Sequence, residues 1–224
     1  MKKKVKITLK LARKIEFSLI ILWLLGASIA GIGLLIYREV TRTPAEYFMR
    51  AHEQMKDNNY RGAVRNFKKV IDGKENEFTP SAAWDLGNIY RLGKGDVAMN
   101  PKLAEEYLTK SSELGFALAQ YDLALMYDIG DKIPENREKA VYWMQEATKS
   151  GYPEALYSMG VWMERGYLGK PDMKKVLDLY ERAADKGHTN AKKSLVVLYA
   201  EGHGGFPKNL ERKQFWLRNL NKGK

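Results

Sequence analysis

Apolar residues in this chain recur at the spacing of one helix face. Ala155, Met159 and Met163 are four residues apart, and a second apolar stripe runs from Ala140 to Ala147 at intervals of three and four. Residues with this spacing lie on one side of an α-helix, which can then pack against a neighbour. The two-residue alternation typical of β-strands is missing from the sequence. We therefore predict an all-α protein.

These stripes belong to a unit of about 36 residues that is copied along residues 80–224. Matching positions carry alanine at Ala82, Ala119, Ala155 and Ala191, an apolar residue at Leu86, Leu123, Met159 and Leu195, a large residue at Tyr90, Tyr127, Met163 and Tyr199, and glycine at Gly115, Gly151, Gly187 and Gly223. A repeat of this length combined with helical stripes predicts a solenoid of helix hairpins. Small residues at Gly87, Ala124 and Gly160 would let neighbouring helices approach closely.

Capping residues mark where the helices of each copy begin and end. Glycine is expected to end the first helix, at Gly93, Gly130, Gly166 and Gly202, and Asn or Asp beside proline to begin the second. The predicted copies are 80–115, 116–151, 152–187 and 188–224. A divergent tetratricopeptide-like hairpin is expected at 44–79, where Thr43 to Glu46 reads as a capping box.

One copy fits a specific consensus. Residues 119–127 match the pattern A-x-Y-x-L-G-x-x-Y, with alanine in place of the glycine, and residues 139–151 match K-A-x-x-W-x-x-x-A with a terminal glycine. This pattern resembles the Sel-one-like repeat (SLR) family, which is related to the tetratricopeptide repeat. The resemblance covers 80–224 and weakens in the last copy, where we assign Phe215 to the tryptophan position. It implies an α/α solenoid that acts as an adaptor between proteins.

An uncharged run of 21 residues, from Phe17 to Tyr37, is long enough to cross a bilayer. Residues 1–16 hold seven basic side chains against one acidic side chain, which predicts that this tail stays in the cytoplasm. We expect a single-pass helix at 17–37 in a bacterial inner membrane, a linker at 38–43 and a periplasmic C-terminal domain. The chain has no cysteine, so it has no disulfides.

Two further interpretations concern the same segment. Ser28 to Ala30 offers small residues suited to a signal peptidase, so a cleaved signal is the alternative to an anchor, although the apolar run continues well beyond that point. Small residues four apart also stack on one side of the predicted helix and would permit self-association or partner packing in lipid. These residues are Gly26, Ala27, Ala30 and Gly31.

Charge and chemistry give few signs of catalysis. The net charge is +11, and much of the excess outside residues 1–16 lies in Lys208–Lys224. We interpret that segment as a solvated helix, or as a contact for anionic lipid or an acidic partner, and we expect no nucleic-acid binding. The three histidines, His52, His188 and His203, do not form a catalytic or metal-binding set, and His52 reads as an exposed helix residue. We therefore predict no enzymatic activity, no cofactor and no metal site.

The remaining candidate is the groove that first helices line in a solenoid. In the tetratricopeptide register, the residues facing it are Asn88, Arg91, Leu125, Asp128, Val161, Glu164 and Val197. The apolar residues of this set would form an exposed strip that a partner protein could bind. If the helices cross more tightly, these residues would instead belong to the core. A second row, formed by Trp84, Tyr121 and Tyr157, is expected to pack within the scaffold.

These observations predict a membrane-anchored scaffold or adaptor whose extracytoplasmic solenoid binds a protein partner in an envelope complex. The partner is expected to be membrane-associated or located in the envelope, because the short linker holds the solenoid near the bilayer. The alternative is an inhibitor or immunity protein that blocks a toxic envelope enzyme, such as a lipase or a cell-wall hydrolase.

Overall fold

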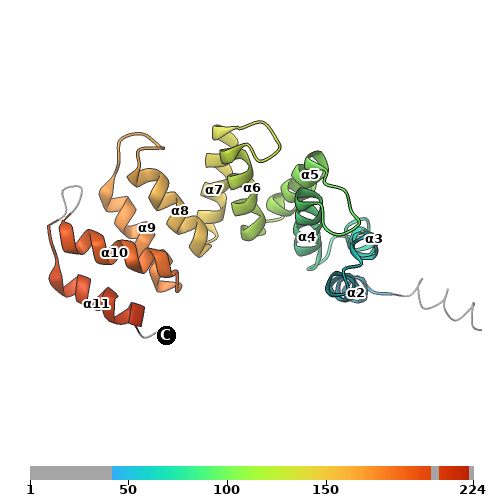
Figure 1. Cartoon of the computed structure of the whole chain (residues 1–224), viewed down its shortest axis with the longest axis horizontal. Helices are drawn as coiled ribbons and strands as arrows, with labels where there is room; N and C mark the ends of the chain where they lie inside the picture. Colours follow the sequence, from blue (N-terminus) through green and yellow to red (C-terminus); the bar gives the residue numbers. More distant parts are fainter. Residues whose placement is uncertain (1–41, 203–206, 222–224) are drawn as a thin grey trace, which may run out of the picture. The chain divides into compact units, whose positions relative to one another are not determined.

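The computed structural model describes residues 42–202 and 207–221, which form ten α-helices and no strands (Figure 1). The helices are α2 (Pro44–Lys56), α3 (Tyr60–Ile71), α4 (Thr79–Leu92), α5 (Pro101–Glu113), α6 (Ala117–Ile129), α7 (Arg137–Lys149), α8 (Pro153–Glu164), α9 (Met173–Asp185), α10 (Thr189–Glu201) and α11 (Leu210–Asn221). The all-α prediction is therefore confirmed for these residues.

The chain divides into two compact units, Met1–Glu46 and Tyr47–Lys224. The predicted capping box lies in the first unit. The backbone N–H of Thr43 donates to Glu46 Oε2 at 2.7 Å, and the N–H of Glu46 donates to Thr43 Oγ1 at 3.3 Å. Each side chain thus satisfies a free amide of the other residue, which fixes the start of α2.

In the unit Tyr47–Lys224 the helices pack in chain order, each on its neighbours (Figure 1). The closest pairs are α4 with α5, α6 with α7, α8 with α9, and α10 with α11. These are the four hairpins that the repeat predicts. The structure confirms a helical-repeat solenoid, and in it α2 and α3 precede these four helix pairs.

Most helix boundaries follow the predicted capping residues, but α8 is capped by Arg165 and not by the predicted Gly166. The side chains of Asn59, Asn100, Asn136 and Asp172 each accept a hydrogen bond from the backbone N–H three residues later. This bond satisfies an amide that the first helical turn leaves free. At the other end, Gly93, Gly130 and Gly202 adopt the left-handed conformation that ends α4, α6 and α10.

The last repeated hairpin corrects one prediction. Asn209 caps α11 by accepting from the backbone N–H of Arg212 at 2.9 Å, so Trp216 stands where Trp143 stands after Asn136. Trp216 is 3% exposed, whereas Phe215 is 47% exposed. The assignment of Phe215 to the tryptophan position is therefore wrong. The reason is one extra residue between Gly202 and Asn209, which shifts the register of α11.

The buried apolar residues form two clusters that share the α6–α7 hairpin. Two glycines allow the helices of a hairpin to cross closely, as predicted from the small residues at these positions. A Cβ atom added at Gly87 would lie 2.7 Å from Leu108 Cγ, and one added at Gly160 would lie 2.6 Å from Tyr180 Cε1. Ala124, at the matching position of α6, is fully buried. Tight contact between the two helices therefore depends on these small residues.

The predicted anchor lies outside the described residues. This applies to the tail 1–16, the span 17–37 with Gly26, Ala27, Ala30 and Gly31, and residues 38–41 of the linker 38–43. Within residues 42–202 and 207–221, no helix is both long enough and apolar enough to span a bilayer.

Candidate protein-binding surfaces

One aromatic row joins consecutive hairpins. The rings of Trp84, Tyr121 and Tyr157 on the first helices contact the residue that caps the next first helix. The ring pairs and their centroid distances are Trp84–Phe116 at 6.0 Å, Tyr121–Tyr152 at 5.4 Å and Tyr157–His188 at 4.5 Å. Edge-to-face and stacked pairs at such distances stabilise packing. The interpretation of this row as scaffold packing is confirmed.

Polar groups reinforce the same junctions. Trp84 Nε1 donates to Asp122 Oδ2 at 2.6 Å, which joins α4 to α6, and the hydroxyls of Tyr121 and Ser158 are 3.3 Å apart, which joins α6 to α8. Burial raises the pKa of Asp122, and the hydrogen bond from Trp84 opposes this rise. The first helices are therefore held in register by side chains and offer little free polar surface here.

At the N-terminal end of the predicted groove, the polar side chains already have partners. Asn88 Oδ1 accepts from Arg91 Nε at 3.2 Å and from Arg91 Nη2 at 3.0 Å, and Arg91 Nη1 lies 3.5 Å from Asp131 Oδ2. Farther along, Asp128 accepts from the hydroxyl of Tyr167. These contacts occupy the groups that a partner would need.

The other predicted groove residues are divided between core and surface. Glu164 accepts from the Tyr180 hydroxyl at 2.6 Å. Leu125 and Val161 are half-buried and pack against the second core cluster, whereas Val197 is 51% exposed. The apolar strip is thus partly covered, and its role in binding stays a prediction.

A second row of tyrosines lies eight residues after the repeated alanines and bridges successive second helices. Tyr127 of α6 donates to Glu105 Oε1 of α5 at 2.5 Å and accepts from Lys139 Nζ of α7 at 3.1 Å. Lys139 Nζ also lies 4.7 Å from the centre of the Tyr127 ring. One side chain thus closes the seam between α5 and α7.

A similar arrangement, with the carboxylate one turn farther along its helix, recurs between α9 and α11. Tyr199 of α10 donates to Glu181 Oε1 of α9 at 2.8 Å, and Arg212 Nη2 of α11 donates to the same carboxylate oxygen at 2.7 Å. The guanidinium of Arg212 lies 5.9 Å from the centre of the Tyr199 ring. Burial raises the pKa of Tyr199, so the phenol stays protonated and can donate.

In the first repeat, Tyr90 closes the seam between α3 and α5 with different partners. Its ring stacks on Tyr107 of α5 with centroids 5.9 Å apart. Burial lowers the pKa of Lys68 on α3, but charge interactions and hydrogen bonds with Tyr107 and Tyr90 outweigh this, and the net shift is upward. A tyrosine and a cation therefore meet at this seam as well.

The seam between α7 and α9 has no such tyrosine among the described residues, because Met163 stands at its position. A pocket of about 360 Å³ opens there. Its apolar lining consists of Met159, Met163, Leu168 and Leu179. Its polar lining consists of Gln145, Thr148, Lys149, Lys175, Asp178 and Arg182. The pocket therefore combines an apolar floor with a polar, largely basic rim.

The basic side chains at this rim are exposed and form short-range ion pairs within their own helices. Lys149 lies 2.5 Å from Glu146, Lys175 lies 3.4 Å from Asp172, and Arg182 lies 3.3 Å from Asp178. Ion pairs at such exposed positions contribute little to stability. The cations can therefore turn to a bound partner at little cost.

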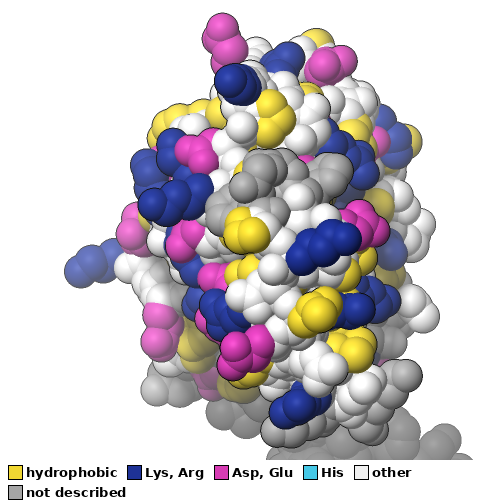
Figure 2. Space-filling model, turned by 90° about the vertical axis from the view of Figure 1, so that its left-hand side faces the viewer, with side chains coloured by type: hydrophobic (Ala, Val, Ile, Leu, Met, Phe, Trp, Pro, Cys, Tyr) yellow, Lys and Arg dark blue, Asp and Glu magenta, His cyan; other side chains and the backbone are white. Residues whose placement is uncertain are grey.

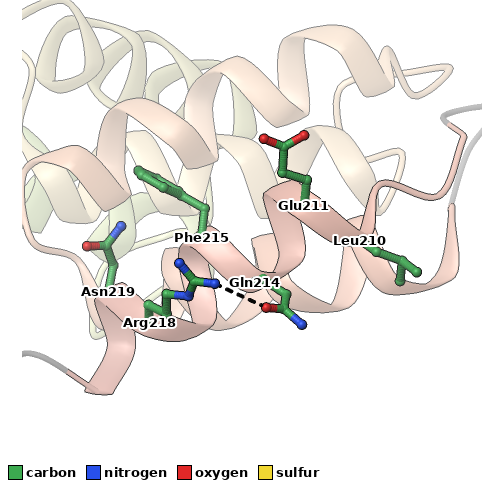
Figure 3. A pocket seen from close by; sticks show the side chains of 6 residues that line it. All are labelled: Leu210, Glu211, Gln214, Phe215, Arg218 and Asn219. Atoms are coloured by element: carbon green, nitrogen blue, oxygen red, sulfur yellow. Dashed lines mark hydrogen bonds between the residues drawn. The ribbon is translucent and has the colours of Figure 1, made fainter.

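The last helix presents a different surface. In Figure 3, α11 carries Leu210, Glu211, Gln214, Phe215, Arg218 and Asn219 around a hollow of about 570 Å³. Leu210 is 66% exposed, and Arg218 Nη2 donates to Gln214 Oε1 at 3.4 Å. Figure 2 shows hydrophobic side chains on this face scattered among both signs of charge. This surface lacks the apolar floor of the α7–α9 pocket.

His52 is less exposed than its sequence position suggested. Its ring packs edge-on against Phe48 and Phe67, and its Nε2 lies 3.4 Å from Asp85 Oδ2. Asp85 is buried, Oδ2 has no hydrogen-bond partner, and desolvation raises the pKa of this carboxyl to about 7. Burial also lowers the pKa of His52. In the described parts of the chain, no group of three His, Asp or Glu side chains could hold a metal ion.

Comparisons with known proteins agree with this architecture. The Sel1 repeat profile matches residues 80–116, 117–152 and 153–188, one residue beyond the predicted ends of the first three copies. A solved Sel1 repeat protein from Oxalobacter formigenes aligns with a TM-score of 0.71 at 22% identity, over 81% of this chain and 74% of that one. This similarity shows the fold.

Two curated fungal proteins are similar in sequence. Chitin synthase regulatory factor 3 of Schizosaccharomyces pombe is 28% identical over 139 residues, which cover 60% of this chain and 15% of that protein. Chitin synthase regulator SKT5 of Saccharomyces cerevisiae is 34% identical over 114 residues, which cover 50% of this chain and 16% of that protein. The chain therefore spans about one-sixth of the length of these relatives.

Proposed function

Because residues 80–188 of this protein match the Sel1 repeat profile three times, we propose that it is a scaffold that binds another protein through its helical solenoid. The observation that carries this proposal is the pocket at the α7–α9 seam, where the repeat leaves an apolar floor open to solvent. The two fungal relatives are named as regulators of chitin synthase, that is, as proteins that act on another protein. Action on another protein is the property of these relatives that supports the proposal.

The finer proposal is that the scaffold is anchored in a bacterial inner membrane. Its support is the sequence alone: an uncharged run at 17–37 preceded by basic residues. With a linker of six residues, which reaches about 20 Å when extended, the solenoid would stay close to the bilayer on the periplasmic side. The partner would then be a membrane protein or a protein assembled at the envelope.

The experiment that tests the scaffold is photo-crosslinking in the native cells. A photoreactive amino acid is placed at Leu125 or Val161 on the first helices, and at Lys149 on the pocket rim, in the full chain. We expect a specific crosslinked protein, identified by mass spectrometry, from at least one of these surfaces. Absence of any specific adduct from all three positions would contradict the scaffold function.

A deletion experiment separates a scaffold from the alternative inhibitor. Loss of a scaffold should dissolve the complex that contains the crosslinked protein, whatever that protein does. Loss of an inhibitor or immunity protein should harm cells only when its target enzyme is present. A C-terminal reporter that is active only in the cytoplasm would contradict the proposed topology.

A further inference from the structure

We propose that the pocket between α7 and α9 is a docking site for a tyrosine side chain of the protein partner. This inference deepens the proposed scaffold function and rests on it. The solenoid fills the neighbouring seams with its own tyrosines, Tyr90, Tyr127 and Tyr199, and only here, among the described hairpins, does a methionine take the place.

The seam filled by Tyr199 provides the template for the vacant one. Glu181 accepts from the Tyr199 hydroxyl, and Gln145 occupies the matching position on α7, one repeat earlier. Arg212 is the third residue of α11 after its cap, and Lys175 is the third residue of α9 after Asp172. The pocket thus keeps an acceptor in the place that it has at the Tyr199 seam, and a cation in the place that it has at both the Tyr127 and the Tyr199 seams.

The floor favours an aromatic ring over an aliphatic chain. Met159 and Met163 present thioethers, and sulfur makes favourable contacts with aromatic ring edges. The cation at the rim can lie against the face of the ring, as Lys139 does 4.7 Å from the centre of Tyr127. A volume of about 360 Å³ accommodates one large side chain together with the backbone that carries it.

The hydroxyl group distinguishes tyrosine from phenylalanine. The side-chain amide of Gln145 can accept from a phenol, and Lys175 can donate to it, as Lys139 Nζ donates to Tyr127 at 3.1 Å. Lys175 is free to do so because its pairing with Asp172, at 3.4 Å, is exposed to solvent. The pocket should therefore prefer tyrosine to phenylalanine, and phenylalanine to leucine.

The first test uses N-acetyl-tyrosinamide as the probe. The full chain is labelled with ¹³C in its methionine methyl groups, and the methyl resonances are followed during titration. We expect saturable shifts at Met159 and Met163 with a Kd on the order of 1 mM, typical of a ligand of this size, and none at exposed Met49 of α2. N-acetyl-leucinamide should bind several-fold more weakly. Equal affinities, or no saturable shift at either pocket methionine, would overturn the proposal.

The second test closes the pocket from within. Met163→Tyr supplies the side chain that the neighbouring repeats carry, and it should fill the site without unfolding the helices. We expect the probe shift at Met159 to be lost and crosslinking from position 149 to fall at least tenfold. Met49→Tyr is the matched control, since it introduces the same side chain on an exposed helix face, and it should change neither result.

The outcomes separate this proposal from the scaffold function. Partner crosslinking that is insensitive to Met163→Tyr, together with no probe binding, would contradict the pocket while leaving the scaffold intact. Probe binding without any crosslinked protein would contradict the scaffold, and with it a protein as the occupant. A concentration-dependent dimer that Met163→Tyr disrupts would assign the pocket to a second copy of this chain, whose Tyr142 is exposed, and would overturn the separate partner.

Discussion

Replacing Asp85 by asparagine should make this protein more stable at neutral pH. Asp85 is 6% exposed, and its Oδ2 atom accepts no hydrogen bond. Desolvation raises the pKa of this carboxyl from 3.8 to about 7, so the folded state disfavours the ionised form. In the unfolded chain the same group ionises near pH 4. The carboxylate therefore destabilises the folded state increasingly as the pH rises from about 4 to about 7.

The size of the effect follows from the shift. Each pKa unit corresponds to about 1.4 kcal/mol, so the full shift of Asp85 amounts to about 4 kcal/mol above pH 7. Between pH 4.5 and pH 7.5, the stability gained by Asp85→Asn relative to the wild type should grow by about 3 kcal/mol. The comparison with wild type at each pH removes the constant cost or gain of the new amide group.

The assay is urea denaturation of the full chain and of the variant, followed by circular dichroism at pH 4.5, 6 and 7.5. A stability difference that does not change with pH would refute the raised pKa. A variant that becomes less stable than wild type near pH 6 would show instead that Asp85 is ionised there and paired with a charged His52, whose Nε2 lies 3.4 Å away. His52→Gln in both backgrounds identifies this second case, since it removes the partner.

Three other expectations concern packing and capping. Leu195→Ala should lower the free energy of unfolding by about 2 to 5 kcal/mol because Leu195 is fully buried, whereas Val197→Ala, on the exposed side of the same helix, should change it by less than about 1 kcal/mol in the same denaturation assay. Gly160→Ala should cost about 1 to 3 kcal/mol, since its Cβ would lie 2.6 Å from the Tyr180 ring, and an unchanged melting temperature would mean that α8 and α9 can separate freely. His188 caps α10 through Nδ1, which accepts from a backbone N–H at 3.1 Å only while the ring is neutral, and burial lowers its pKa. Its contribution is therefore complete above pH 6.5 and lost as the pH falls below it, and His188→Asn should remove this dependence from unfolding curves between pH 7 and pH 5.

The fold could be predicted because its signals are local and repeated. Asn100, Asn136 and Asp172 each cap a helix through an amide three residues away, so the sequence alone identifies the pairing. Gly87 and Gly160 stand at the same offset in their copies, and the structure places both where a neighbouring helix crosses. The register of α11 was misassigned because it was counted at a constant repeat length from Trp143, whereas counting seven residues from the cap Asn209 leads to Trp216.

The site was harder to predict because its contacts join residues that are far apart and outside the repeat. Asp128 was expected to face the groove. In the structure its carboxylate accepts a hydrogen bond from the hydroxyl of Tyr167, which lies in the loop after α8. Arg91 is held in the same way by Asp131, which follows α6. His52 looked exposed because its partner Asp85 belongs to another hairpin. Loop side chains differ from copy to copy, so the tetratricopeptide register could not indicate which groove positions they cover.

Met163 takes the place of a tyrosine in this row, and the residues that bind the hydroxyls of the other tyrosines show why this difference matters. On the sequence, Met163 is one apolar residue among large ones, and a core position would tolerate either. In the structure, Tyr127 and Tyr199 extend past the core. Each contacts a carboxylate on one second helix and lies beside a cation on the next, so the two hydroxyls lie among polar groups at the surface. Methionine cannot make those bonds, yet Gln145 and Lys175 remain at the rim of the vacant seam. A single residue that departs from a repeat therefore indicates a binding site when the residues around that position still follow the repeat pattern.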